Sequence, residues 1–410
     1  RTRRRARRHC VAARDRQPAS RHLRRAARAH GPVARRRYVM KVAVCGGGSI
    51  ALTAAAVLAA RPGFEVSVLT RAPSSWSGIA TIHFGDRLRL AGPVDATDDP
   101  ARAIGSRDWV LLAVPAFAHA ALLERIRPFL APHAWVGCIG CAAGFDWRVA
   151  RILGNDVRHF GLQRTPWVAR TVVRGQVVHV TAVRGRVGIA GHPSRELAAL
   201  APRLSDAFGL ELHPLNGYLS VTLGFDNPTL HPPRLFALYG SGRPVPPAVR
   251  FYGDWDDAAS THLLRIDEEL ARIRRALNVP DEVGARAHFG VDSPDALTAL
   301  IRAMTPLRDI TVPSRADGSP DTDARFFQED FAHGLAIHRA IGRLAGVETP
   351  ALCAMLEWAE TLTGKPRDDR AMPPSPWHDA QSLGLRDAAS VESFSHRAGA
   401  GAAILDGSPC

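Results

Sequence analysis

Two patterns of apolar and polar positions follow one another along the chain. From residue 41 to about residue 215, short apolar runs are separated by glycine or proline turns and by helical stretches. Short buried runs of this kind are typical of parallel strands that alternate with helices. After Gly217 the apolar residues recur at helical spacing over longer segments. The pattern therefore predicts an α/β domain over residues 40–215 and a mainly α-helical domain over residues 216–367.

The first apolar run is followed at once by three glycines. Lys41–Cys45 predicts a buried strand, Gly46-Gly47-Gly48 a tight loop, and Ile50–Ala60 an Ala/Leu-rich helix that ends at a Pro-Gly pair. Glu65–Thr70 predicts a second strand. A strand, a glycine loop, a helix and a strand within about 30 residues form the setting of a dinucleotide-binding fingerprint. The first domain is therefore predicted to be of the Rossmann type.

The fingerprint reads Gly46-x-Gly48-x-x-Ala51. The first glycine permits the tight turn, the second lets the backbone approach a pyrophosphate, and Ala51 allows close packing of the helix on the strand. The helix N-terminus, with Ser49 and Ile50, offers amide donors and partial positive charge to phosphates. We predict that Gly46, Gly48, Ser49 and Ile50 contact a dinucleotide; the alternative is a glycine turn in an unrelated α/β domain.

The end of the second strand bears on the choice of cofactor. An acidic residue there would bind the ribose 2′-hydroxyl of NAD, but this chain has Thr70-Arg71. A guanidinium beside a hydroxyl suits a 2′-phosphate, so NADP(H) is preferred and NAD(H) remains an alternative. Pro115 follows the predicted strand at Trp109–Val114 and is expected to face the same crevice.

Two short segments of the helical half carry candidate chemistry. In Asp226-Asn-Pro-Thr-Leu-His231-Pro-Pro, a histidine lies between prolines, which predicts a stiff and partly non-helical backbone. In Arg325-Phe-Phe-Gln-Glu-Asp330, an arginine and a carboxylate precede or open an amphipathic helix over Phe331–Ala345. His333 and His338 are expected on the surface of that helix, and a further helix is predicted over Pro350–Thr363.

The order of the glycine fingerprint, N-P-x-x-H-P and R-F-F-x-E-D-x-x-x-G-L resembles the octopine/nopaline (opine) dehydrogenase family, over roughly residues 41–365. The resemblance implies NAD(P)H-dependent reductive condensation of an amino acid with a 2-oxo acid. It carries the catalytic histidine over to His231, with Asn227 four residues before it. Asp330 corresponds to the family's aspartate and Arg325 to its carboxylate-binding arginine. Ser49 and Ala51 depart from the Asn and Gly of many members.

The chemistry of these residue types fits those roles. A histidine titrates near neutrality and can move the protons that hydride transfer to an imine or carbonyl requires. A carboxylate on its other ring nitrogen would fix the tautomer; Asp330 is the expected partner and Asp226 the rival. A planar guanidinium, here Arg325, can hold a substrate carboxylate through two bonds. Asn227 could hydrogen-bond a substrate carbonyl or carboxylate.

The distribution of formal charge is informative only for the N-terminal segment. Residues 1–40 contain 15 arginines and one acid, Asp15, so the whole formal net charge of +14 falls there. We interpret residues 1–39 as upstream sequence before a true start at Met40 or as a disordered basic tail; a targeting peptide or a polycationic nucleic-acid-binding arm are alternatives. Residues 368–410 are expected to form a loosely ordered tail.

Other function classes remain open at this point. A reductase of a 2-oxo or 3-hydroxy acid has the same layout, but such enzymes often use a domain-two lysine, and the body has only Lys41 and Lys365. A non-catalytic nucleotide-binding sensor is the alternative of another class. Few cysteines and no long apolar run favour a soluble cytoplasmic enzyme without membrane or specific nucleic-acid partners. Cys138 and Cys141 lack a second ligand pair, so no metal is predicted, and a homodimer is left open.

Overall fold

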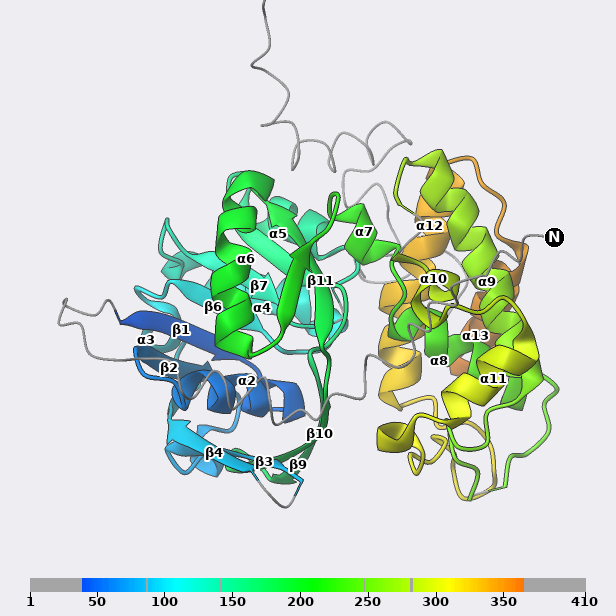
Figure 1. The fold of residues 1–410 in the computed structure, drawn as a ribbon, viewed down its shortest axis with the longest axis horizontal. Coiled ribbons are helices and arrows are strands. Elements are labelled where there is room, and N and C mark those ends of the chain that lie inside the picture. Colours follow the sequence, from blue (N-terminus) through cyan, green and yellow to red (C-terminus); the bar gives the residue numbers. More distant parts are fainter. Residues whose placement is uncertain (1–38, 86–87, 141, 247, 281–282, 365–410) are drawn as a thin grey trace, which may run out of the picture.

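Parallel strands carry the first half of the chain. The computed structural model describes residues 39–364 except 86–87, 141, 247 and 281–282, so the predicted basic and C-terminal tails, Cys141 and Lys365 lie outside the described residues. A strand-rich lobe and a helical lobe lie side by side in it (Figure 1). Among the described helices, none combines the length and the apolarity that crossing a bilayer requires.

The main sheet has eight strands in the order β12-β11-β8-β7-β6-β1-β2-β5. Neighbouring strands are parallel except β11 and β8, which run antiparallel. From β1 the chain first adds β2 and β5 on one side of the sheet and then adds β6 and the later strands on the other side. The strand order therefore reverses between β1 and β6. Ligands of such sheets bind at the carboxyl ends of the strands beside that reversal. The strands are β1 (Met40–Cys45), β2 (Phe64–Leu69), β5 (Asp95–Thr97), β6 (Trp109–Leu112), β7 (Trp135–Cys138), β8 (His159–Leu162), β11 (Arg186–His192) and β12 (Glu211–Pro214).

The alanine-rich helix α2 (Ser49–Ala59) lies between two sheets. A second sheet, in the order β4-β3-β10-β9, covers the face of α2 that is turned away from the main sheet (Figure 1). Its strands are β3 (Ile79–Phe84), β4 (Leu88–Pro93), β9 (Trp167–Val173) and β10 (Val177–Val183). Every residue from Ala51 to Ala59 is buried. Small side chains suit this place, because a Cβ at Gly92 would lie only 2.2 Å from the backbone of Ala59.

The other helices of this lobe cover the main sheet and its edges. They are α3 (Pro100–Ile104), α4 (His119–Ile126), α5 (Phe145–Leu153) and α6 (Ser194–Phe208), with 3₁₀ turns η2 (Pro73–Ser75), η3 (Ala116–Ala118) and η4 (Arg127–Phe129).

The helical lobe is built around α9 (Asp257–Ala276), which packs against α8, α10, α11, α12 and α13. Two buried carboxylates of α9 join its neighbours to it. Asp267 accepts from the backbone N–H of Ala285, and Glu269 accepts from those of Ala351 and Leu352, at 2.7–2.9 Å. A carboxylate at a helix N-terminus satisfies free amide donors and complements the helix dipole. The lobe contains α7 (Leu219–Thr222), α8 (Asn227–Tyr239), α10 (Ala285–Phe289), α11 (Pro294–Arg302), the 3₁₀ turn η6 (Thr305–Leu307), the π-helix η7 (Phe326–Leu335), α12 (Ala336–Leu344) and α13 (Pro350–Thr363).

The prediction of a partly non-helical backbone around His231 is wrong. The segment forms α8, with Asp226 as N-cap and Pro228 in the first turn, where a missing N–H costs nothing. Pro232 and Pro233 lie inside the helix and forgo two backbone bonds. Extensive packing of α8 on α9 and η7 holds the helix in spite of that loss.

The helix predicted over residues 331–345 is also different. The structure has a π-helix, η7, that continues into α12, and this continuous helix is enclosed by α8, α9, α13 and η3. His333 and His338 were expected on its surface, but they are 8% and 1% exposed. Neighbours on several sides leave this helix without the solvent-facing side that a surface histidine needs.

Several histidines are buried in forms that resist protonation. Burial lowers the pKa of His119 to about 3 and that of His159 and His338 to about 4. The unfolded chain binds these protons near pH 6.5, so stability is full above pH 6.5 and is lost as the pH falls toward 4. Burial also raises the pKa of the Asp146 carboxyl to about 7. As the pH falls below about 7, the folded state binds this proton before the unfolded chain does, which partly offsets the stability lost through the histidines.

We expect the melting temperature of His338→Gln to fall less steeply than that of the wild type between pH 6.5 and 4. A glutamine can keep the hydrogen bond that His338 Nε2 donates to the Thr222 carbonyl at 2.8 Å, but it binds no proton. Thermal unfolding followed by circular dichroism at a series of pH values measures the slopes. His83→Gln, at an exposed position of β3, is the control. Equal slopes for wild type and His338→Gln would contradict this account.

Candidate active site

The glycine loop between β1 and α2 has the geometry of a phosphate cradle. Gly46 has φ +141°, and a Cβ there would lie 2.6 Å from the Ala113 carbonyl oxygen, so only glycine fits. A Cβ at Gly48 would meet nothing within 4 Å, so this side of the loop faces open space. Ala51 is fully buried directly behind the loop. The N-terminus of α2 therefore opens toward a space that a ligand can occupy.

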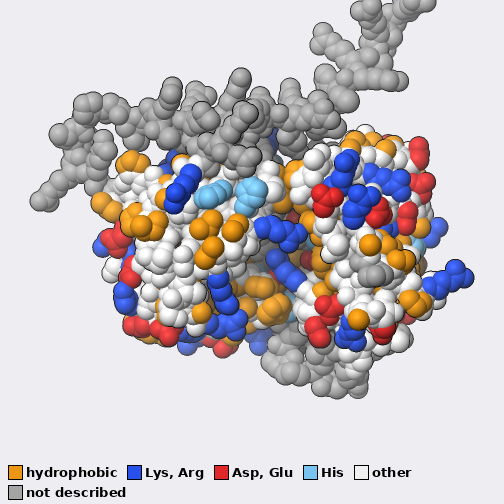
Figure 2. Space-filling model, turned by 90° about the horizontal axis from the view of Figure 1, so that it is seen from below, with side chains coloured by type: hydrophobic (Ala, Val, Ile, Leu, Met, Phe, Trp, Pro, Cys, Tyr) orange, Lys and Arg blue, Asp and Glu red, His pale blue; other side chains and the backbone are white. Residues whose placement is uncertain are grey.

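A large cleft lies between the two lobes and begins at this loop. Its volume is ≈ 2610 Å³, far more than a pocket for one small ligand needs. Figure 2 looks onto the hollow between the lobes, with basic side chains along its rim. All the residues predicted to bind the cofactor line this cleft, namely Gly46, Gly48, Ser49, Ile50, Thr70, Arg71 and Pro115. So do His231, Asn227 and Arg325 from the helical lobe.

Thr70 and Arg71 lie where β2 ends. Thr70 is buried, and its backbone N–H donates to the Thr97 carbonyl at 2.9 Å, which fixes the end of the strand. Arg71 is exposed and lines the cleft. Ser49 contacts the second sheet instead, since its hydroxyl is 3.0 Å from Thr171 Oγ1 and accepts from the Thr171 N–H at 3.0 Å. Arg71 therefore projects from the end of β2 into the cleft that begins at the glycine loop.

His231 and Asp330, 99 residues apart in sequence, meet where α8 packs on η7. His231 Nδ1 lies 2.7 Å from Asp330 Oδ2, and the two side chains are only 8% and 5% exposed. Gly334 permits this approach, because a Cβ there would lie 2.3 Å from Pro228. The Phe326 ring packs edge-on against the imidazole with centroids 4.5 Å apart. This geometry makes Asp330 the partner of His231.

The second nitrogen of the imidazole contacts a residue that the sequence did not single out. His231 Nε2 lies 2.8 Å from the hydroxyl of Tyr252, which is 5% exposed and lines the cleft. Since Asp330 accepts from Nδ1–H, the neutral ring accepts at Nε2 and Tyr252 O–H donates. Burial and the charge of Asp330 raise the pKa of this phenol. Tyr252 lies in an irregular segment between α8 and α9, where no spacing or motif marks it.

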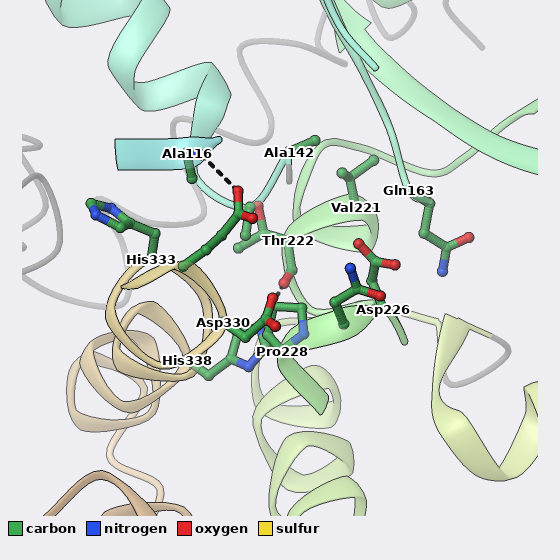
Figure 3. A pocket seen from close by; sticks show the side chains of 14 residues that line it. Ala116, Ala142, Gln163, Val221, Thr222, Asp226, Pro228, Asp330, His333 and His338 are labelled. Carbon is green, nitrogen blue, oxygen red and sulfur yellow. Dashed lines mark hydrogen bonds between the residues drawn. The ribbon is translucent and has the colours of Figure 1, made fainter. Parts of the chain in front are cut away.

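Arg325 and Glu329 connect the cleft to the nucleotide lobe. Arg325 Nε donates to Glu329, and the arginine side chain is still 54% exposed toward the cleft. Glu329 is buried, and its other oxygen accepts from the Ala116 N–H at 2.8 Å, the dashed contact in Figure 3. Ala116 follows Pro115 at the end of β6. One buried carboxylate thus orients the arginine and joins the two lobes beside the cleft.

Asp226 and Asn227 begin α8 on the other side of the dyad. The Asp226 N–H donates to Thr229 Oγ1 at 3.3 Å, and its carboxylate lies 3.9 Å from Arg164 Nε. Burial raises the pKa of this carboxyl, and Arg164 acts in the opposite direction. Asp226 therefore caps the helix, whereas Asp330 binds the imidazole. Asn227 lines both the cleft and the small cavity described next.

A small cavity of about 20 Å³ lies behind the dyad. Figure 3 shows side chains that line it, among them Val221, Thr222, Asp226, Pro228 and Asp330. His333 and His338 also line it. Its volume is that of about one water molecule. The large cleft, by contrast, has the volume that a dinucleotide and small-molecule substrates need.

Comparisons with known proteins agree with this layout. Residues 214–363 match the family model described as NAD/NADP octopine/nopaline dehydrogenase, alpha-helical domain. Residues 42–191 match the model described as ketopantoate reductase PanE/ApbA. The two matched segments correspond to the two lobes of the structure.

Individual relatives extend over nearly the whole body. The chain is 27% identical to octopine dehydrogenase of Pecten maximus, covering 80% of this chain and 91% of that protein. It is 27% identical to tauropine dehydrogenase of Arabella iricolor, covering 78% and 91%. An octopine dehydrogenase structure with NADH and L-arginine superimposes with a TM-score of 0.73 at 25% identity, covering 86% of this chain and 98% of that one. Residues 214–363 thus match the α-helical domain of the octopine/nopaline dehydrogenases, and over most of its length the chain is similar to opine dehydrogenases, which are NAD(P)-dependent oxidoreductases acting on the CH–NH bond of secondary amines.

Proposed function

We propose that this protein catalyses the NADPH-dependent reductive condensation of an amino acid with a 2-oxo acid, and the reverse reaction. The observation that carries the proposal is the His231–Asp330 pair, whose imidazole lines the same cleft as the glycine loop. The relatives are named as tauropine and octopine dehydrogenases, and the octopine dehydrogenase structure holds NADH and L-arginine. A homodimer and a cytoplasmic location belong to the same proposal.

The residues present fit a dinucleotide. Gly46 allows the turn, the space at Gly48 admits a pyrophosphate, and the N-terminus of α2 faces it. When bound, the reduced nicotinamide supplies a hydride to the carbon that joins the two substrates. Pro115 and the end of β6 border the part of the cleft that continues toward His231.

His231 handles the protons of the condensation. Held by Asp330 at Nδ1, its neutral ring can accept a proton at Nε2 from the amino acid's ammonium group, which frees the amine for attack. The imidazolium can return that proton to the oxygen that leaves as water. Asp330 stabilises the charged ring in between. Tyr252 lies at Nε2 and can donate to the same oxygen, while its raised pKa keeps the phenol protonated.

Arg325 binds a substrate carboxylate in this proposal. Glu329 holds its Nε side, so the guanidinium enters the cleft with a fixed direction. Phe326, the next residue, packs on the His231 ring. A carboxylate on Arg325 would thus place its neighbouring carbonyl carbon beside the proton-transferring nitrogen. Asn227 offers a further hydrogen bond in the same cleft.

A reductase of a 2-oxo or 3-hydroxy acid without an amine partner is the second candidate. The match of residues 42–191 to the ketopantoate reductase model favours it. The helical half, which carries His231, Asp330 and Arg325, matches the octopine/nopaline dehydrogenase domain instead. The amine dependence of turnover separates the two candidates.

We expect NADPH oxidation with pyruvate, glyoxylate or 2-oxoglutarate to require an added amino acid. A matrix of amino acids against these oxo acids, followed at the nicotinamide absorbance, measures this. His231→Gln should lower kcat about 10²–10⁴-fold, the usual contribution of a general acid–base, and leave NADPH binding intact. A turnover rate that is the same with and without amine would exclude the condensation and support the simple reductase.

We expect Tyr252→Phe to lower kcat about tenfold, corresponding to ~1.4 kcal/mol for one hydrogen bond in the transition state. The KM for NADPH should not change, because the hydroxyl contacts His231. Tyr239→Phe removes a hydroxyl that donates to the Pro313 carbonyl away from the cleft, and it is the matched control. Unchanged steady-state kinetics of Tyr252→Phe would show that the phenol takes no part.

We expect Arg71→Ser to raise the KM for NADPH about 10–100-fold and to leave that for NADH nearly unchanged. The loss corresponds to ~1.5–3 kcal/mol for charge-assisted bonds to the 2′-phosphate. Arg89→Ser on β4, exposed and outside the cleft, is the control. A wild-type protein that uses NADH as well as NADPH, with Arg71→Ser affecting both equally, would contradict the NADP preference.

A further inference from the structure

The cleft between the lobes carries a large excess of positive charge. Among the described residues, eight arginines line it, against two carboxylates, Glu211 and Asp309. Glu211 is already paired with Arg186 at 3.0 Å. Figure 2 shows basic side chains around the hollow. A dinucleotide's phosphates account for the arginines near the glycine loop, but Arg164, Arg184 and Arg325 line the part that holds His231 and Tyr252.

Arg164 is held in place mainly by uncharged groups. It follows β8, and its side chain is 13% exposed. Nη1 donates to His288 Nε2 at 2.8 Å, which requires an unprotonated nitrogen there, and the guanidinium lies over the Phe225 ring at 4.9 Å. The carboxylate of Asp226 lies 3.9 Å from Arg164 Nε. The aromatic face and the imidazole orient the guanidinium, and Asp226, at the start of α8, balances part of its charge.

Arg184 adds a second guanidinium at the same place. It follows β10, is partly buried, and donates from Nε to the carbonyl of Thr165, the residue next to Arg164. The charges of both arginines act on Tyr252 and on Asp226, where they oppose the effect of burial on each pKa. Both guanidiniums therefore lie within electrostatic reach of the phenol that contacts His231.

The two arginine sites come from different lobes. Arg164 and Arg184 belong to strand ends of the nucleotide lobe, whereas Arg325 begins η7 in the helical lobe and adjoins Phe326, which packs on His231. His231 and Tyr252 therefore share the cleft with one guanidinium of the helical lobe and two of the nucleotide lobe. Reductive condensation joins two molecules that each carry a carboxylate next to the reacting atom, so two separate carboxylate sites flanking the proton-transfer group match its geometry.

We propose that Arg164 and Arg184 form a second carboxylate subsite, opposite Arg325, so that each condensing partner has an arginine site of its own. This inference rests on the proposed function and extends it to the class of substrate. The product then carries two carboxylates on either side of one secondary amine. Amines that lack a carboxylate are expected to be poor substrates, because they bring no anionic group for the two guanidiniums to bind in this partly buried site.

The KM values of the two partners test the assignment. Arg325→Met is expected to raise the KM of one partner at least tenfold, and Arg184→Met that of the other, each with a smaller effect on the remaining KM. Arg184→Lys keeps the charge and should recover part of the loss. Arg203→Met, exposed on α6 and outside the cleft, is the control. If both variants raise the KM of the same partner, the two sites are not separate and the inference is overturned.

Binding of a product-like probe gives a readout that needs no turnover. Iminodiacetate is a secondary amine between two carboxylates, and sarcosine is the matched amine with one. With NADP⁺ bound, iminodiacetate is expected to bind wild type at least tenfold more tightly than sarcosine in calorimetric titrations. Arg184→Met and Arg164→Met/Arg184→Met should lose this preference, and Arg203→Met should keep it. The single variant covers the case that loss of Arg164 unfolds the protein, since Arg164 also contacts Asp226 and His288.

The two proposals fail in different ways. A wild-type preference for iminodiacetate that Arg184→Met abolishes supports the subsite even if no substrate pair is turned over, and in that case only the proposed reaction is lost. Amine-dependent turnover with an unchanged preference in Arg184→Met supports the reaction and overturns the subsite.

Discussion

The contact between His231 and Asp330 is the constraint on which the site depends. It joins two segments 99 residues apart, and it exists because α8 and η7 approach closely enough for a 2.7 Å hydrogen bond between side chains that are almost fully buried. Gly334 against Pro228 sets that approach. A buried imidazole with a carboxylate on one nitrogen is held in one tautomer, so in the proposed reaction the other nitrogen is the one that exchanges protons.

The relation between the lobes depends on a second buried carboxylate. Glu329 precedes Asp330 in the π-helix, and it accepts from the Ala116 N–H of the nucleotide lobe while it binds Arg325. Successive residues of one helical turn therefore serve the lobe interface and the imidazole. π-Helical turns are rare and recur at functional sites, because the wider turn directs neighbouring side chains differently from an α-helix. In this structure the buried side chains of Glu329 and Asp330 follow one another and still contact different partners, Ala116 and His231.

Much of the fold follows from local pattern. The strand, glycine loop and helix at the start of the body are found within one residue of the predicted bounds, and the helix predicted over Pro350–Thr363 is found as α13. The sequence could not show that Asn227–Tyr239 is helical, because its prolines oppose helix formation and tertiary packing overrides them. Nor could it show Tyr252, whose position beside His231 depends on how an irregular segment folds over α8. His333 and His338 were predicted on a helix surface for the same reason. The spacing of apolar residues does not show that neighbouring helices enclose this helix.

The placement of Tyr252 also bears on the proton transfer that we propose. Its hydroxyl occupies Nε2 of His231, so an incoming substrate oxygen or amine meets the phenol and the imidazole together. Burial raises the pKa of the phenol, and Asp330 adds to the rise, so a phenolate beside the dyad is costly. Tyr252 can therefore donate a hydrogen bond or pass a proton only while it receives another, and the net proton is carried by His231. Arg164, Arg184 and Arg325 line the same cleft, and their positive charges oppose a positive charge on the imidazole. In the proposed reaction the adjacent carboxylate of Asp330 offsets that effect and stabilises the imidazolium.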